Sequence, residues 1–418
     1  RSWKQEFGTG NYHINGNPGA AMWYEASTLT ESLNSAIISS ISAPADSTGS
    51  LTATSTTATS EIFTSIEEYD GSFGPNGTFQ MWAASIDLDD VQMYINSDEY
   101  NRQLASGVDY AFTKDIFTFY QVATVGDGSA DDGNVFSYDI IEHSGGMIVP
   151  VGVTSGDIGR LNTGLSGVYD YILFHINPTT GMFMYFQNGS TKDEEVYAIT
   201  ELADGQVAFV GRSTGDLGDP THTNLGGYDI FLAIHDMTTH TTDYYQTGTG
   251  FNDVGIGVHD IGNNKLAVAF TTSGAFSGFT NQGGQDIGVV EFNYVTDVWG
   301  TAYQTGSETT EFVSQNGNHS ALLPDGRIAI VGQTSGFFAD DAFTTGLLDI
   351  FLGIIDPSDG TWKRFQIGTG ANDFGTSVNA IGDKLLIVGY TEAAISDGQH
   401  GVYLEFDSSK GIRGKITS

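Results

Sequence analysis

Short, almost continuous apolar runs recur along the chain, each starting at a polar turn and ending eight residues later at a serine or threonine. Lys384–Thr391, KLLIVGYT, is one example, and a turn at residues 381–383 precedes it. Such a run between turn signals predicts a strand buried on both faces. Seven copies occur. Their turn anchors are Gly19, Gly77, Gly146, Gly205, Asn264, Gly326 and Asp383, and their hydroxyl residues are Ser27, Ser85, Thr154, Ser213, Thr272, Thr334 and Thr391.

Two further marks keep the same period. An acid opens the expected third strand of five units, at Asp109, Asp170, Asp229, Asp286 and Asp349. A glutamine preceded by Tyr or Phe ends the expected fourth strand, at Gln121, Gln187, Gln246, Gln304 and Gln366. The sequence of each unit therefore predicts four strands.

A period of roughly 60 residues built from strands and turns is typical of a radial array. We expect an all-β fold, a seven-bladed β-propeller with four antiparallel strands per blade, forming a single domain over residues 1–418. The blade repeats start near residues 5, 55, 121, 187, 246, 304 and 366. Terminal strands are expected to close the ring, supplied by residues 2–7 or 411–417. The alternative for residues 35–63 is a Ser/Thr-rich linker.

The unit D-I-F-L-x-I-x-D-P-x-x-G … F-Q-x-G-T-G-x-x-D-x-G … I-V-G-x-T resembles the SBBP family of seven-bladed β-propeller repeats. Its clearest copy is residues 349–391, and residues 229–272 keep most of the pattern. The resemblance covers residues 121–406 well and the first two blades weakly. It implies a propeller fold and the context of secreted or surface-displayed bacterial proteins, and it carries no catalytic residues.

The amino-acid composition limits the classes of partner that the protein can bind. The 418 residues include 51 acidic and 15 basic side chains, a formal charge of −36, which argues against a nucleic-acid backbone or an anionic membrane surface as partner. The absence of cysteine excludes disulfides and thiolate metal sites. No apolar run approaches the roughly 18 residues of a spanning helix, so no membrane insertion is expected. We expect an extracellular or surface-exposed location on a cell or virion.

The connections between the expected second and third strands vary in length and sequence, and in repeat arrays the variable face usually binds. They carry aromatic and acidic residues, which suit sugar stacking and protein contacts. The candidate ligand-binding residues are Asp90, Tyr94, Tyr100, Asp157, Asp216, Phe276, Phe337 and Asp340. The alternative is that these aromatics tuck under their own loops.

The hydroxyls that end the second strands could form a polar ring at a channel mouth. We favour a structural role, in which they satisfy backbone groups where each strand leaves its sheet.

Residues 127–134, DGSADDGN, begin like an oxygen-rich calcium loop, with Asp127, Ser129 and Asp131 as weak candidate ligands. Asp132 stands where that loop needs glycine, and we align it with Asp253 and Asp373 as a turn-capping residue. No resident cofactor is expected. His235 and His240 flank an expected turn and are not predicted to be a ligand pair.

Enzyme motifs such as H-E-x-x-H, G-x-S-x-G and a phosphate-binding glycine loop are missing from the sequence. We therefore expect a non-catalytic recognition protein that binds a glycan or protein ligand through its variable loop face. One alternative is an architectural subunit of an appendage, surface layer or phage tail, assembled into a larger structure. Another is a glycan-acting hydrolase or lyase that uses a pair of loop carboxylates.

Overall fold

The computed structural model describes residues 60–68, 79–87, 117–122, 135–156, 169–180, 183–217, 223–314, 317–339, 347–382, 384–393, 400–407 and 411–416. Within these ranges the chain is all-β, built from antiparallel strands without a helix. The predicted all-β class is thereby confirmed. No element of this described part is a helix long and apolar enough to cross a bilayer.

Six sheets follow one another along the described chain, and within each sheet the strands pair largely in sequence order. The first holds β1 (Ser60–Glu68), β2 (Phe79–Asp87) and β3 (Phe117–Val122). The second holds β4 (Val135–His143), β5 (Met147–Thr154), β6 (Asp170–Ile176) and β7 (Phe183–Asn188). The third holds β8 (Glu194–Glu201), β9 (Val207–Ser213), β10 (Asp229–His235) and β11 (Thr242–Thr247).

The remaining three sheets repeat this plan. The fourth holds β12 (Asp253–Gly262), β13 (Lys265–Thr272), β14 (Asp286–Asn293) and β15 (Val298–Thr305). In the fifth, β16 (Glu311–Phe312) and β17 (Ser320–Leu322) together take the place of a first strand beside β18 (Ile328–Thr334), β19 (Asp349–Asp356) and β20 (Thr361–Ile367). The sixth holds β21 (Asp373–Ile381), β22 (Lys384–Thr391), β23 (His400–Asp407) and β24 (Gly411–Ile416).

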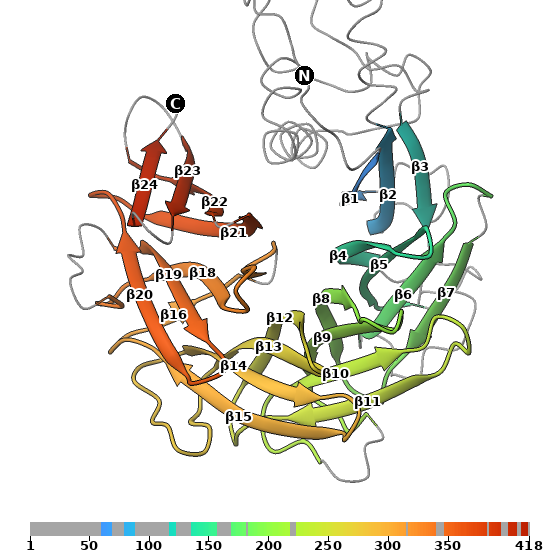
Figure 1. The fold of residues 1–418 in the computed structure, drawn as a ribbon, viewed down its shortest axis with the longest axis horizontal. Coiled ribbons are helices and arrows are strands. Elements are labelled where there is room, and N and C mark those ends of the chain that lie inside the picture. The colour runs from blue at the N-terminus through green and yellow to red at the C-terminus, as the bar shows by residue number, and fades with distance from the viewer. Residues whose placement is uncertain are drawn as a thin grey trace, which may run out of the picture.

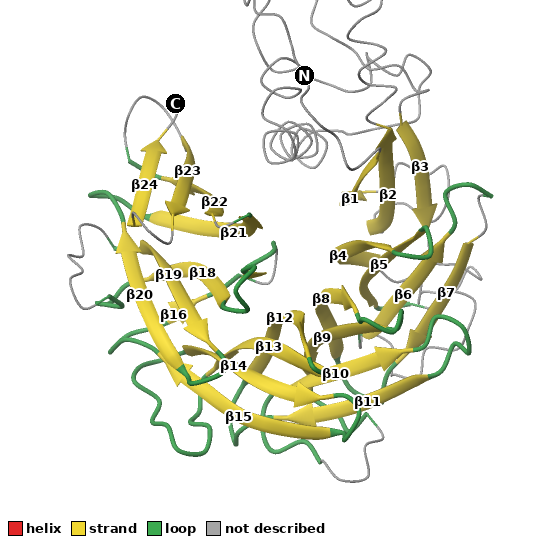
Figure 2. Ribbon diagram, viewed as in Figure 1, coloured by secondary structure: helices red, strands yellow, loops and turns green. Residues whose placement is uncertain are grey.

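The sheets are arranged radially, like propeller blades (Figures 1 and 2). The first strands β4, β8, β12 and β21 lie nearest the centre, and the fourth strands β7, β11, β15 and β20 lie at the periphery (Figure 1). The described sheets do not form a closed ring. The predicted blade that starts near residue 5 lies outside the described residues, so seven blades and ring closure stay predictions.

The hydrophobic core lies between neighbouring sheets. One cluster joins Val210 and Leu232 of the third sheet to Val268, Phe270 and further apolar residues of the fourth, and equivalent clusters join the second sheet to the third, the fourth to the fifth and the fifth to the sixth. The middle strands β10 and β18 are buried along their whole length. Their uninterrupted apolar sequences follow from this, because both faces of each middle strand are covered by the adjacent sheets.

A β-bulge recurs in the first strand of four sheets, where the register shifts by one residue. In the third sheet the shift falls between Val196 and Ala198, at Tyr197. Opposite it lies Gly211, where a Cβ would stand only 1.8 Å from the carbonyl oxygen of Glu195. At Gly152, Gly211 and Gly389 of the V-G-x-[ST] pattern, a Cβ would stand less than 2 Å from a carbonyl oxygen of the bulged strand, so these positions need glycine.

Candidate functional site

One face of the array carries the connections between second and third strands together with the connections between sheets; we call it the loop face. Backbone hydrogen bonds tie these two sets of connections together. The amide of Asp253 donates to the carbonyl of Tyr228 at 2.7 Å, and the amide of Ser273 donates to the carbonyl of Asn252 at 2.8 Å. The amide of Glu311 repeats the first of these bonds one sheet later. The loop face is therefore held by a fixed backbone frame.

The periodic glutamines hold the loops. Gln246 is fully buried, and its Nε2 donates to the carbonyl of Gly215 at 2.9 Å, while its Oε1 accepts from the amide of Leu217 at 3.0 Å. Gln304 and Gln366 make the same two bonds in the next two sheets. Each glutamine thus fixes the start of its own sheet's second-to-third connection.

The strand-end hydroxyls from Thr154 onward, which are those whose side chains the structure describes, have the predicted structural role. Ser213 and Thr334 are fully buried, and each Oγ accepts a hydrogen bond from the amide two residues later. Ser213 Oγ also donates to Glu194 at 2.8 Å, and Thr334 Oγ1 donates to Glu311 at 2.9 Å. The sequence analysis did not single out these two glutamates.

Acids from adjacent sheets approach each other across the glycine that follows each fourth strand. Asp229 opens β10 and Asp253 opens β12, and both are buried. Burial, and then the neighbouring Asp253 carboxylate, raise the pKa of Asp229 to about 6. Burial also raises the pKa of Asp286 and of Glu311, the equivalent pair one sheet later. Each of these acids therefore loses its proton at a higher pH than an exposed carboxyl group does.

Several sequence-predicted site residues lie outside the described residues. These are Asp90, Tyr94, Tyr100, Asp157 and Asp340, and the calcium candidates Asp127, Ser129 and Asp131. The proposed alignment of Asp132 with Asp253 is wrong. Asp253 pairs with Thr272, whereas the partner of the equivalent Thr154 is Val135, three residues beyond Asp132.

The candidate residues that the structure describes differ in burial, and the difference follows from a shift of one position along the loop. Asp216, Ala275 and Phe337 each follow the glycine whose carbonyl accepts a hydrogen bond from the glutamine, and all three are exposed. Phe276 comes one residue later, and its side chain is only 8% exposed. Its ring packs on Phe270, with centroids 4.6 Å apart. The expectation that Phe276 faces a ligand is therefore corrected, because this position anchors the loop in the core.

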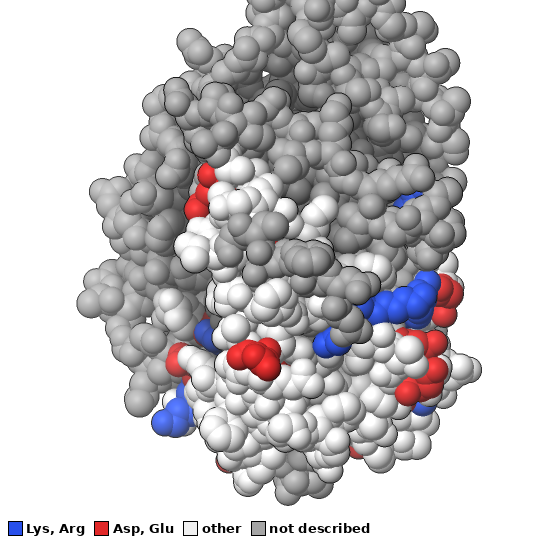
Figure 3. All heavy atoms as spheres, turned by 90° about the vertical axis from the view of Figure 1, so that its left-hand side faces the viewer, with Lys and Arg blue, Asp and Glu red and all other residues white. Residues whose placement is uncertain are grey.

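Large apolar side chains are nevertheless exposed on the loop face. Phe337 is 65% exposed, and Leu225, Phe251 and Leu347 are exposed on neighbouring connections of the same face. On the side of the molecule formed by the last sheets, the described surface is mostly uncharged, with acidic and basic side chains next to each other (Figure 3). The described part of this side shows no continuous basic patch.

A cavity of about 300 Å³ lies among the first strands. Asp139 Oδ2 accepts from the amide of Ile199 at 2.9 Å, and a 2.8 Å hydrogen bond joins His259 Nε2 to Ser320 Oγ. Burial raises the pKa of Asp139 to about 6 and lowers that of His259 to about 4. These polar groups tie β4 to β8 and β12 to β17, so they brace the inner wall.

A tyrosine, a glutamate and an arginine meet on the inner part of the third sheet. Tyr197 Oη donates to Glu195 at 2.6 Å, and Arg212 forms an ion pair with the same carboxylate at 2.6 Å. The Arg212 guanidinium also lies 4.0 Å from the ring centroid of Tyr228. Burial raises the pKa of Tyr197 well above its usual value, so the phenol stays protonated.

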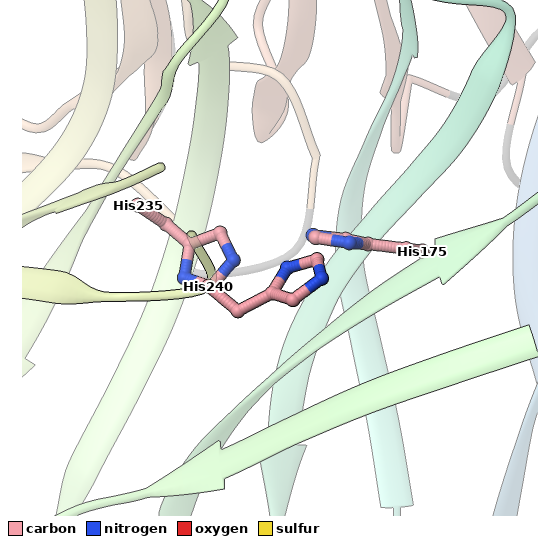
Figure 4. Close-up of side chains that lie close together, drawn as sticks. All are labelled: His175, His235 and His240. Atoms are coloured by element: carbon pink, nitrogen blue, oxygen red, sulfur yellow. The ribbon is translucent and has the colours of Figure 1, made fainter. Parts of the chain in front are cut away.

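Three histidines converge at the turn edge opposite the loop face (Figure 4). They are His175 on β6, His235 at the end of β10, and His240 in the turn before β11. One ligand atom of each lies within 4.8 Å of the others. The prediction that His235 and His240 are not a ligand pair missed this arrangement, since His175 comes from a different sheet.

Comparison with known proteins gives a fold-level likeness. No family model matches the chain. No curated protein matches it either. Among solved structures, Trypanosoma rangeli sialidase shows a TM-score of 0.42 at 10% identity, over 84% of this chain and 53% of that one.

Two further solved structures are similar at this level. The β-propeller domain of the Trilobed protease from Pyrococcus furiosus has a TM-score of 0.36 at 11% identity, over 67% of this chain and 70% of that one. MPT-4, a mannose phosphorylase from Leishmania mexicana, has a TM-score of 0.33 at 15% identity, over 71% and 91% of the two chains. With every one of these TM-scores below 0.5, the likeness carries no conclusion about activity.

Proposed function

We propose that this chain is a non-catalytic recognition protein that binds a macromolecular ligand, a protein or a glycan, through its loop face. The observation that carries the proposal is that the hydrogen-bonded backbone of these loops is the same from sheet to sheet, whereas the exposed side chains on it differ. Asp216, Ala275 and Phe337 occupy equivalent exposed positions on the same hydrogen-bonded frame, yet they are acidic, small and aromatic. A fixed scaffold with variable exposed positions suits recognition.

A protein ligand is favoured over a glycan by the aliphatic component of the exposed surface. Leu225 and Leu347 are exposed on the same face of the array as the aromatic Phe251 and Phe337. Aromatic rings alone serve sugar stacking, whereas clustered aliphatic and aromatic side chains are typical of protein contacts. The formal charge of −36 further favours a neutral or basic ligand surface.

The test is capture of ligands by the immobilised chain from proteins of its surroundings and from a glycan array. Phe337→Ala and Leu347→Ala should weaken binding of the captured ligand by about tenfold each, as for central interface residues. Val298→Ala is the matched control, since Val298 is 56% exposed but lies at the edge opposite the loop face. Equal effects of all three substitutions, or none, would exclude the loop face as the binding surface.

The surrounding architecture is part of the proposal. We infer that the chain forms a seven-bladed ring in which residues 5–54 are the remaining blade. We also infer that it is an SBBP-like repeat protein and that it is displayed outside the cell or on a virion. The regular spacing of the sequence repeats and the radial order of the described sheets support the ring. If the chain is instead an architectural subunit, substitutions on the outer strands β11 and β15 will disrupt assembly while loop-face substitutions will not.

A glycan-acting enzyme is the second candidate. It is favoured by the Tyr197–Glu195 hydrogen bond beside Arg212, because a tyrosine paired with a glutamate serves as nucleophile in some glycosidases. The raised pKa of Tyr197 and its burial weigh against an activated phenolate. Turnover of polysaccharides that Tyr197→Phe abolishes would establish this candidate, and unchanged turnover would remove it.

A further inference from the structure

We propose that His175, His235 and His240 form a binding site for a transition-metal ion such as Zn²⁺, which would bridge the second and third sheets. This site lies away from the loop face and is independent of the proposed recognition function. Two of its ligands come from third strands of adjacent sheets, and the third comes from the turn that follows β10. Figure 4 shows the three imidazoles meeting.

The first support is the state of the buried ring nitrogens. His175 and His235 are each only 1% exposed, and the Nε2 atom of each is buried without a hydrogen-bond partner. A buried polar atom without a partner costs free energy, so native structures rarely leave one unless it has another use. A metal ion supplies that missing partner.

The second support is the tautomer of His235. Its Nδ1 lies 2.9 Å from Thr242 Oγ1. If Nδ1 donates its proton to that hydroxyl, the lone pair is on Nε2, which is the atom without a partner. Metal-binding histidines usually have their second ring nitrogen held by such a hydrogen bond.

The third support is the fixed turn that presents His240. Asp236 Oδ1 accepts from the amides of Thr238 and Thr239, at 2.7 and 2.9 Å, and the amide of His240 donates to the Asp236 carbonyl. His240 itself has a φ of 60°, and its side chain is exposed. The turn thus holds the third imidazole over the two buried ones while leaving the site open to solvent.

The distances allow closure around one ion. Bonds of about 2.1 Å from metal to nitrogen require the three nitrogens to come within about 3.5 Å of one another. The ligand atoms now lie within 4.8 Å of one another, so the imidazoles have to move closer together when an ion binds, and the exposed His240 side chain is the one free to rotate. Three imidazoles and an open position suit Zn²⁺, Cu²⁺ or Ni²⁺, whereas Ca²⁺ and Mg²⁺ require oxygen ligands.

An aromatic cluster is the competing explanation. The Phe186 ring packs against the site, 4.7 Å from the His175 centroid and 4.8 Å from the His235 centroid. Packing accounts for the contacts between rings. It does not account for two buried Nε2 atoms without partners that meet a third imidazole.

The test is titration of the chelator-treated full chain with Zn²⁺, and with Co²⁺ as a spectroscopic probe, in excess Mg²⁺ to occupy the many surface carboxylates. We expect one Zn²⁺ per chain, Co²⁺ absorption typical of nitrogen ligands, and a higher melting temperature with Zn²⁺. His240→Asn, which keeps a residue type tolerant of positive φ, should weaken binding more than tenfold. Thr239→Ala, in the same turn, should bind like the unaltered chain.

His235→Gln is a second variant, whose folding is checked by melting in chelator. This variant should not bind the one Zn²⁺ per chain that the unaltered chain binds. The proposal is overturned if the unaltered chain binds no Zn²⁺ in excess Mg²⁺, or if His240→Asn and folded His235→Gln both bind it unchanged. The latter result would place the ion elsewhere.

Discussion

The carboxyl groups of Asp229 and Asp253 face each other across Gly248, although they belong to different sheets. A Cβ on Gly248 would lie 2.7 Å from Asp229 Oδ1 and 3.0 Å from Asp253 Oδ2. Asp253 Oδ2 accepts hydrogen bonds from the amide and hydroxyl of Thr249, and Asp229 Oδ2 accepts from the amide of Leu225. The two carboxyl groups therefore lie close together in a buried site at the base of the loop face, and each is held by hydrogen bonds from its own neighbouring connection.

The first prediction concerns pH. The pKa of Asp229 is about 6 in the folded chain, against about 4 for an unfolded aspartate. Between these values the folded state binds more protons, so the free energy of unfolding falls as pH rises. The contribution of Asp229 is fully present below about pH 4 and lost above about pH 6. Asp229→Asn should flatten this decline and add on the order of 2 kcal/mol near pH 7, relative to the unaltered chain.

Urea unfolding between pH 4 and pH 8 measures this effect. Asp243→Asn is the control, since Asp243 is exposed on β11 and should leave the profile unchanged. Profiles of equal slope for Asp229→Asn and the unaltered chain would contradict the prediction, because they would show that folding does not raise the pKa of Asp229.

A second prediction concerns the space between the two acids. Gly248→Ala places a methyl group against both carboxyl groups and should lower the free energy of unfolding by about 2 kcal/mol. Gly250→Ala is a matched control two residues away, because nothing lies within 4 Å of a Cβ there. Chemical denaturation that finds both substitutions equally tolerated would contradict the described approach of the acids.

The third prediction concerns the glutamine that holds each loop. Gln246→Ala leaves the buried amide of Leu217 without its partner and removes one of the two hydrogen bonds that the carbonyl of Gly215 accepts, which should cost about 2 kcal/mol. Gln282→Ala is the control on an exposed loop position. Hydrogen exchange should show faster exchange at the Leu217 amide in the first variant alone. Unaltered exchange there would mean that Gln246 does not fix the loop.

A fourth prediction separates the two phenylalanines of the loop candidates. Phe276→Ala removes a buried ring and should cost about 3 kcal/mol of stability, measured by thermal or urea unfolding. Phe337→Ala should change stability by less than about 0.5 kcal/mol, because its side chain is mostly exposed. The reverse order of effects would mean that the exposed position has been assigned one residue out of register.

The sequence predicts the frame well because the frame consists of local, repeated features. The run of Lys384–Thr391, the turn before it and the hydroxyl at its end all recur with one period, and the structure places them in equivalent strands. The periodic aspartates that open the third strands and the periodic glutamines that end the fourth strands could be found in the same way. Their partnership, in which Gln366 Nε2 donates to Asp349 Oδ2 at 2.9 Å, needed the paired strands to be seen.

The candidate site was predicted less well, for two physical reasons. Exposure alternates from one residue to the next, so Phe276 and Phe337 look alike in sequence although one is buried and the other is not. The histidine cluster joins His175 to residues about 60 positions later, and only the packing of two sheets brings them together. The glutamates Glu194 and Glu311 were missed because the fourth and sixth sheets have aspartate at that position and the second sheet has valine.

A crystal structure of the full chain with a ligand captured on the loop face tests the central claim most directly. The account predicts seven sheets around one axis, residues 5–54 forming one of them, and the ligand in contact with Phe337 and Leu347. A ring of six or eight sheets, residues 5–54 outside the ring, or a ligand bound only at the opposite edge would contradict it.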